Sequence, residues 1–158
     1  MLFADVVGQA RIKAQLLGQL SSDRVPHAQL LLGPEGCGKL ALALACAQYL
    51  QCDRPGETDA CGQCENCRKA ERLMHPDIHF SFPTVGGKAT SSDFMEFWRS
   101  MLGESAYFGV NDWLQHLGAE NKQGNITAEE CVQIVKKLSL KIFEGKYKVL
   151  ILWLPEYL

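Results

Sequence analysis

The stretch Gly33-Pro34-Glu35-Gly36-Cys37-Gly38-Lys39 has the glycine spacing of a loop that binds phosphate. Such a loop surrounds phosphate oxygens with backbone N–H groups at the start of a helix, and its lysine adds a positive charge. The pattern normally continues with a Ser or Thr hydroxyl that coordinates Mg²⁺, but this chain has Leu40 there. ATP binding is therefore in doubt, and a glycine-rich turn with a solvated lysine is the alternative. The residues of this degenerate nucleotide site are Gly33, Gly36, Gly38 and Lys39.

An acidic pair is also missing from the place where a hydrolysing enzyme of this type needs it. The pair follows a later apolar strand, where one carboxylate holds Mg²⁺ and the other activates water. The strand candidate here is Val149 to Leu152, and the next two residues are Trp153 and Leu154. The nearest acid, Glu156, stands behind a proline. We expect no intrinsic ATPase activity and predict no catalytic residue.

Four cysteines within sixteen residues could form a metal site. Cys52-x8-Cys61-x2-Cys64-x2-Cys67 supplies the four thiolates that a tetrahedral structural Zn²⁺ uses, and the two short steps are typical of a zinc knuckle. Free core cysteines and an iron–sulfur cluster are the alternatives. Four ligands leave no open coordination position, so the predicted role is structural. The other cysteines are separate: Cys37 lies in the glycine loop, and Cys46 and Cys131 lie on predicted helices.

The histidines give no support for hydrolase chemistry. His27, His75, His79 and His116 are scattered along the chain, and none pairs with a Ser or Cys in a recognisable nucleophilic arrangement.

Composition excludes several classes of protein. The chain has 158 residues, 47% of them apolar, which is enough for one domain with a real core. A formal charge of −2 gives no general basic field for nucleic acid. The apolar runs are shorter than the roughly 18 residues of a membrane helix, and the N-terminus lacks the features of a secretory signal. We expect a cytoplasmic protein whose cysteines stay reduced.

Apolar periodicity predicts alternating helices and strands. We expect helices over about 9–20, 40–50, 68–73, 92–102 and 111–117, with a turn at 21–26. Another helix follows Thr127-Ala128-Glu129-Glu130, a capping-box sequence, and runs to about Leu138. Strands are expected at 27–32, 77–82 and 148–152. This order predicts an α/β fold with a parallel sheet flanked by helices.

Together, these features resemble the N-terminal AAA+ module of bacterial DNA polymerase III clamp-loader subunits, most closely the delta-prime family. The residues that carry the resemblance are Phe3, Val7-Gly8-Gln9, His27-Ala28, the glycine loop, the four-cysteine insertion, His75-Pro76-Asp77, 126–138 and Gly145-Lys146-Tyr147-Lys148-Val149. The resemblance implies a P-loop NTPase (AAA+) sheet with an inserted four-cysteine zinc module at about 52–67. It also marks 84–125 as an insertion, whose aromatics form either a partner surface or a small core. Residues 1–158 would be an N-terminal fragment that ends just after the Walker B-like strand.

The resemblance implies a function within a five-subunit ring that uses ATP to place the sliding clamp on primed DNA during replication. Leu40, Trp153 and Leu154 favour the delta-prime stator, a subunit that does not itself hydrolyse ATP within the polymerase III holoenzyme. The alternative is the ATP-hydrolysing gamma/tau motor subunit. A zinc-stabilised DNA-binding module is less consistent with the acidic residues of 52–67. Implied partners are the gamma/tau and delta subunits, the sliding clamp and primed DNA. The family's Ser-Arg-Cys arginine-finger motif does not occur in this sequence.

Overall fold

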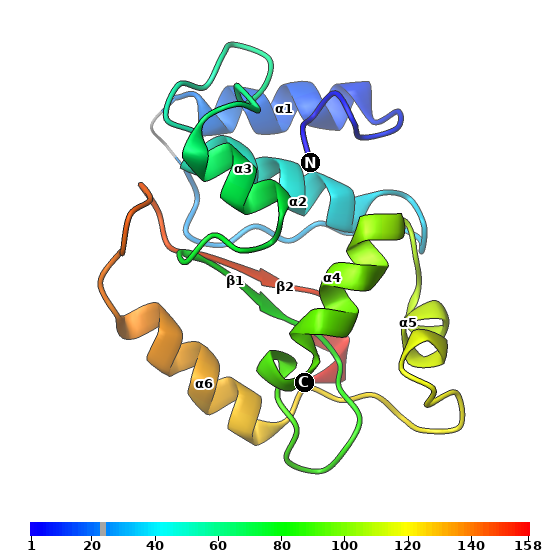
Figure 1. Ribbon diagram of the computed structural model, residues 1–158. Helices are drawn as coiled ribbons and strands as arrows, with labels where there is room; N and C mark the ends of the chain where they lie inside the picture. The colour runs from blue at the N-terminus through cyan, green and yellow to red at the C-terminus, as the bar shows by residue number, and fades with distance from the viewer. Residues whose placement is uncertain (23–24) are drawn as a thin grey trace.

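The structure, a computed structural model, describes residues 1–22 and 25–158 (Figure 1). The turn expected at 21–26 lies partly outside these residues. The chain forms α1 (Ala10–Leu20), α2 (Lys39–Gln51), α3 (Glu65–Glu71), β1 (Ile78–Ser81), η1 (Ser91–Phe94), α4 (Met95–Glu104), α5 (Val110–His116), α6 (Ala128–Ser139), β2 (Val149–Leu152) and η2 (Pro155–Tyr157). The six predicted helices are confirmed, with η1 replacing the first turn of the one expected at 92–102. None of the helices in the described ranges is both long and apolar enough to cross a membrane.

Two of the three predicted strands form a small parallel sheet. β1 and β2 pair in register from Ile78 with Val149 to Ser81 with Leu152. Three helices lie between these strands in the sequence, as a parallel connection requires. The α1, α2 and α3 helices lie together on one side of the sheet, and α6 lies on the other (Figure 1).

The prediction of a strand at 27–32 is wrong. Residues 28–34 have no regular secondary structure, and neither β1 nor β2 forms a backbone hydrogen bond with them. Leu30 and Leu32 are 69% and 82% exposed. An apolar run becomes a strand only where another strand satisfies its backbone groups, and neither β1 nor β2 pairs with this segment. The structure therefore shows an α/β fold without a full P-loop sheet.

The core is built around α2, which is buried on nearly every side. Leu40, Leu42 and Leu44 are buried together with the alanines between and after them. This explains why α2 is almost uniformly apolar, since a helix that packs on all faces has no polar stripe. The helix thereby carries the glycine loop at its N-terminus and Cys52 at its C-terminus.

One part of the same core consists of aromatic rings from 80–113 and of Trp153, which follows β2. Trp98 stacks on Phe82 at 4.2 Å between ring centroids and lies 5.4 Å from both Trp113 and Trp153. Thr84 and Asn125 form a two-bond antiparallel bridge that joins the ends of the segment expected as an insertion. Most aromatic side chains of this segment belong to a core, which was one of the two alternatives expected for them. They share that core with β1 and Trp153.

The capping box expected at Thr127 is only half formed. The Thr127 hydroxyl accepts a hydrogen bond from the Glu130 N–H at 3.1 Å, as an N-cap should. The Glu130 carboxylate does not return to the Thr127 N–H. It is buried and accepts instead from the Ser91 N–H at 2.9 Å, which ties α6 to η1.

Candidate metal centre and phosphate loop

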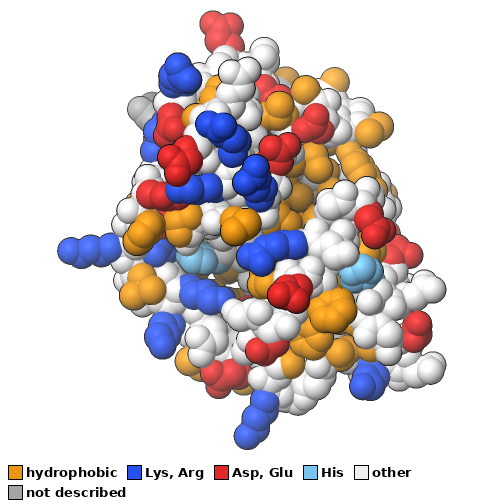
Figure 2. All heavy atoms as spheres, in the orientation of Figure 1, with side chains coloured by type: hydrophobic (Ala, Val, Ile, Leu, Met, Phe, Trp, Pro, Cys, Tyr) orange, Lys and Arg blue, Asp and Glu red, His pale blue; other side chains and the backbone are white. Residues whose placement is uncertain are grey.

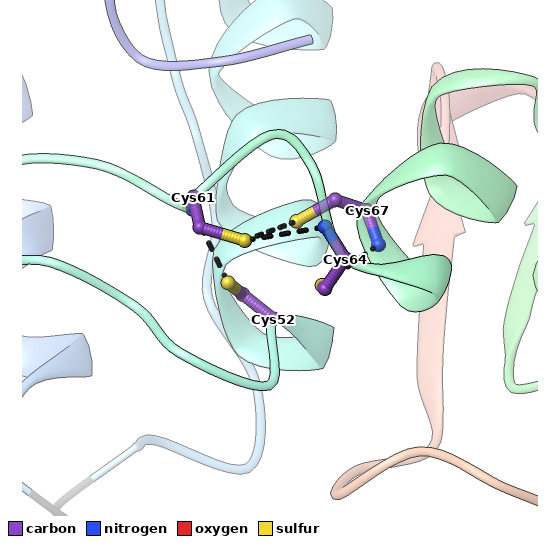
Figure 3. Close-up of side chains that lie close together, drawn as sticks. All are labelled: Cys52, Cys61, Cys64 and Cys67. Atoms are coloured by element: carbon purple, nitrogen blue, oxygen red, sulfur yellow. Dashed lines mark hydrogen bonds between the residues drawn. The ribbon is translucent and has the colours of Figure 1, made fainter.

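The four predicted cysteines lie together between the end of α2 and the start of α3 (Figure 3). Their sulfur atoms all lie within 4.8 Å of one another, and the Cys61 and Cys67 sulfurs are 3.9 Å apart. Tetrahedral zinc with Zn–S bonds of about 2.3 Å would place its sulfurs about 3.8 Å apart. All four residues are free cysteines. Their arrangement could therefore hold one metal ion.

Backbone N–H groups are directed at the sulfur atoms. The Cys61 N–H donates to the Cys52 sulfur at 3.2 Å, and the Cys64 and Cys67 N–H groups each donate to the sulfur three residues earlier at 3.4 Å. The N–H groups of Gln63 and Cys64 lower the pKa of Cys61 to about 6. Burial raises the pKa of Cys52 and Cys67. A cation would offset the cost of ionising these buried thiols, which is the usual chemistry of a thiolate metal site.

The loop between Cys52 and Cys61 also anchors the N-terminus of the chain. The Asp59 carboxylate accepts hydrogen bonds from the N–H groups of Phe3 at 3.0 Å and Ala4 at 2.8 Å. Phe3 is buried against Tyr49 of α2, edge to face. Asp59 is one of the acidic residues of 52–67, and its contact with the N-terminus was not predicted. A cap formed by residues 56 positions apart leaves no local pattern in the sequence.

The glycine loop closes on itself around Lys39. Gly36 and Gly38 adopt positive φ angles of 72° and 90°, which explains why glycine stands at these positions. The Lys39 ammonium donates to the carbonyl oxygens of Gly33 at 2.7 Å and Pro34 at 2.6 Å. A lysine that binds phosphate must direct its charge at the phosphate oxygens. In this conformation the charge of Lys39 is instead directed at the loop's own backbone.

Part of the 84–125 segment covers this loop. Glu35 accepts a hydrogen bond from the Val110 N–H at 3.1 Å, and Gly109 lies directly against the Glu35 carboxylate. A Cβ atom at Gly38 would lie 3.0 Å from the Tyr107 ring, whose hydroxyl accepts a hydrogen bond from the Val7 N–H at 2.7 Å. Residues 107–110 thus bridge the glycine loop and the N-terminal segment. This contact was not predicted from the sequence.

Both positions that lack magnesium ligands have structural uses. Leu40 is buried in the α2 core. Trp153 is buried between aromatic rings, with centroids 5.4 Å from Trp98 and 5.1 Å from Phe108. Glu156 is exposed on η2. The side chains that replace the hydroxyl and the first acid are therefore part of the packing.

Asp77 and Gln51 hold the segment that leads into β2, and neither was predicted as a site residue. The fully buried Asp77 carboxylate accepts hydrogen bonds from the N–H groups of residues 143, 144 and 145 at 2.7, 2.9 and 2.8 Å. The Gln51 amide accepts from the Lys146 N–H and donates to the Tyr147 carbonyl. The Gln51 amide occupies the place that a Cβ atom at position 145 would take, so glycine is the residue that fits there. The end of α2, next to the cysteines, is thereby fixed to β2.

Comparison with known proteins relates the chain to subunits of DNA polymerase III. It is 41% identical over 76 residues to DNA polymerase III subunit tau of Escherichia coli, which is 48% of this chain and 12% of that protein. Subunit gamma/tau of Mycobacterium tuberculosis is 43% identical over 65 residues, 41% of this chain and 11% of the relative. Subunit delta' of Bacillus subtilis is 37% identical over 75 residues, 48% of this chain and 22% of the relative. The matches thus span less than a quarter of each relative's length.

The match to a protein family extends much further along the chain. The family model described as "DNA polymerase III, delta subunit" matches residues 8–158, which include the glycine loop, the four cysteines and β2. The expected resemblance to clamp-loader AAA+ subunits is confirmed. The chain belongs to the DNA polymerase III delta-subunit family.

Proposed function

We propose that this chain is the AAA+ module of a delta-prime-type clamp-loader subunit, a stator that does not hydrolyse ATP. The observation that carries the proposal is the loss of both magnesium-binding features. Leu40 replaces the hydroxyl, Trp153 and Leu154 replace the acidic pair, and Leu40 and Trp153 are buried apolar residues of the fold. Since magnesium chemistry needs oxygen ligands at these places, a module of this kind would serve its neighbours in the ring as a rigid surface.

The geometry of the glycine loop supports the same proposal. Lys39 is bonded to two backbone carbonyls of its own loop, and residues 107–110 lie over Glu35 and Gly38. A nucleotide phosphate would have to break the Lys39 contacts and displace the covering segment. The proposed partners are the gamma/tau and delta subunits, and through them the sliding clamp and primed DNA, in the bacterial cytoplasm.

We also propose that the four cysteines bind a structural Zn²⁺. Four thiolates in a closed set, with backbone N–H groups directed at three of the sulfurs, are the donor chemistry that zinc prefers in structural sites. The proposed ion leaves no open position for a substrate. It would hold the 52–67 loop, and hence the N-terminal residues on Asp59, against α2.

The second candidate is the ATP-hydrolysing motor subunit. The observation that favours it is the higher identity to tau and gamma/tau subunits, 41% and 43%, than to the delta' subunit, 37%. The two candidates differ in nucleotide binding, which can be measured directly.

Equilibrium ATP binding by the full-length gene product, with and without Mg²⁺, separates the two candidates. We expect weak binding that Mg²⁺ does not strengthen, because Leu40 has no oxygen to coordinate the ion. A purified gamma/tau subunit serves as the positive control. Tight binding that strengthens with Mg²⁺ would contradict the stator proposal and favour the motor.

Replacing Leu40 by Thr is expected to leave ATP hydrolysis undetectable. The variant restores a hydroxyl next to Lys39, but Trp153 and Leu154 still supply no acid to activate water. Because Leu40 is buried, we expect the free energy of unfolding to fall by about 2 kcal/mol. Leu42→Thr on the same helix, also buried, is the matched control for that loss. Clear turnover by Leu40→Thr would mean that another carboxylate performs the role assigned to the missing pair.

A further inference from the structure

A cavity of about 230 Å³ opens on the face of the molecule where β1, η1, α4 and α6 meet. It lies apart from the glycine loop and the cysteines, because its lining contains residues of neither. Apolar side chains such as Ile78 and Met95 form part of its wall. Polar and charged side chains form the rest, and the principal ones are His79, Ser92, Arg99 and Lys137. Figure 2 shows blue Lys and Arg side chains beside a pale-blue His side chain near the middle of this face.

Neither cation of the cavity is neutralised by an acid. The Lys137 ammonium donates to the Ser92 hydroxyl at 3.0 Å, and the Arg99 Nε donates to the Leu73 carbonyl at 3.3 Å. Neither side chain forms an ion pair within residues 1–22 and 25–158. No Asp or Glu lines the cavity. Two positive charges therefore face one small space without a counter-charge, a local arrangement that favours an anion although the whole chain is slightly negative.

His79 adds a polar atom that has no partner. Its Nε2 is buried and forms no hydrogen bond with any described residue. Buried polar atoms are nearly always paired, but this one has no exposed surface through which it could reach a ligand in the cavity. Burial, followed by the charges of Lys137 and Lys148, lowers the pKa of His79, whereas Asp77 acts in the opposite direction. The lowered pKa favours the neutral imidazole at neutral pH, so His79 lines the cavity without adding a charge to those of Arg99 and Lys137.

We propose that this cavity binds a small oxyanion of the phosphate or carboxylate type, held by Arg99 and Lys137. The guanidinium keeps N–H donors beyond its bond to Leu73, and the ammonium keeps donors beyond its bond to Ser92. An oxyanion accepts several such hydrogen bonds at once, and bonds between charged groups are the strong ones. The two cations come from α4 and α6, elements that the core already fixes, so the site requires no loop to be ordered.

The direct test titrates inorganic phosphate into the full-length, metal-loaded protein at low ionic strength. Calorimetry measures affinity, and NMR follows the His79 imidazole resonances. We expect saturable millimolar or tighter binding that shifts the His79 signals. Arg99→Gln and Lys137→Gln should each weaken it about tenfold or more, as the loss of one charge-assisted hydrogen bond implies. An absence of saturable binding by the unchanged protein would overturn the proposal.

Matched variants separate this site from general charge effects and from the glycine loop. Lys136→Gln on α6 and Arg72→Gln after α3 remove exposed cations that do not line the cavity, so phosphate affinity should be unchanged. Lys39→Ala should also leave the phosphate affinity of the cavity unchanged, since Lys39 belongs to the glycine loop and does not line the cavity. An equal loss in any of these three variants would refute the cavity as the binding site.

Competition identifies which oxyanion the cavity prefers. Acetate that displaces phosphate at similar concentration would indicate a carboxylate, such as an acidic side chain, as the natural occupant. Preference for phosphate over acetate would indicate a phosphate-bearing ligand. Competition by chloride at the same concentration as phosphate would contradict both, because it would show simple charge screening.

Discussion

Substitution of Cys67 by Ser is expected to lower the midpoint of thermal unfolding by roughly 6 to 12 °C. Cys67 is fully buried, and its sulfur lies 3.9 Å from that of Cys61. The free energy of metal binding to such a set of cysteines contributes directly to folding, and in small zinc domains it is about 10 kcal/mol or more. If the substitution lowers the free energy of global unfolding by only about 3 kcal/mol, the unfolding midpoint of a domain of this size falls by roughly 6 to 12 °C. Differential scanning calorimetry with parallel metal analysis measures both quantities.

The effect should reach beyond the cysteine loop because the loop is connected to other parts of the fold. Asp59 holds Phe3 and Ala4, and Asn66 contacts both Asp53 and His75. Amide exchange of the N-terminal residues should therefore accelerate in Cys67→Ser. The control is Cys131→Ser, a partly exposed cysteine on α6 outside the cluster, which should change neither metal content nor stability. A chelator that removes no metal and leaves the unfolding midpoint unchanged would refute the zinc proposal.

The elements predicted correctly are those whose signal is local. The capping residue Thr127 and the apolar positions after it identified α6, and the apolar run at 149–152 became β2. The cysteine spacing identified the cluster, because short x2 steps bring sulfurs together whatever surrounds them. In each case the residues that determine the structure are close in sequence. Pattern reasoning is reliable under that condition.

The features that escaped prediction depend on distant residues. The apolar run at 27–32 reads as a strand, but pairing depends on neighbours that a local pattern does not contain. Trp153 was recognised as the wrong residue for an acid, but its packing on Trp98 and Phe108 depends on residues far away in the sequence. Lys39 is an exception, because its partners Gly33 and Pro34 are close in sequence, yet the loop's residue types do not indicate that the ammonium bonds these carbonyls.

The chain uses its polar side chains to connect segments that hydrophobic packing alone would leave free to shift. Asp59 fixes the N-terminus, Gln51 fixes residues 146 and 147, and Glu130 fixes η1 to α6. Each of these acceptors or donors is bonded to backbone groups, whose positions do not depend on the identity of the side chains there. A module that serves as a rigid surface for its neighbours would benefit from such connections, because they limit local opening.

Among these connections Asp77 should matter most, and we expect Asp77→Ala to reduce the free energy of unfolding by about 3 kcal/mol or more at pH 7. The substitution leaves three N–H groups, at residues 143 to 145, without their acceptor, and Asp77 is 0% exposed. Asp93→Ala is the matched control. Its carboxylate is exposed and caps η1 through Thr90, so the expected loss of stability is clearly smaller than that of Asp77→Ala. Urea unfolding followed by circular dichroism gives both values.

The pH dependence gives this prediction a second, independent measurement. Burial by itself would raise the pKa of Asp77, but the backbone N–H groups of residues 143 to 145 outweigh it and lower the pKa below its ordinary value. A carboxylate whose pKa is lower in the folded state stabilises the fold fully above the unfolded value, near about 3.9, and loses that contribution as the pH falls through the folded value. The difference between the unchanged protein and Asp77→Ala should therefore be constant from about pH 7 to about pH 5 and shrink below about pH 4. A difference that stays the same in acid would mean that Asp77 acts through packing, not through its charge.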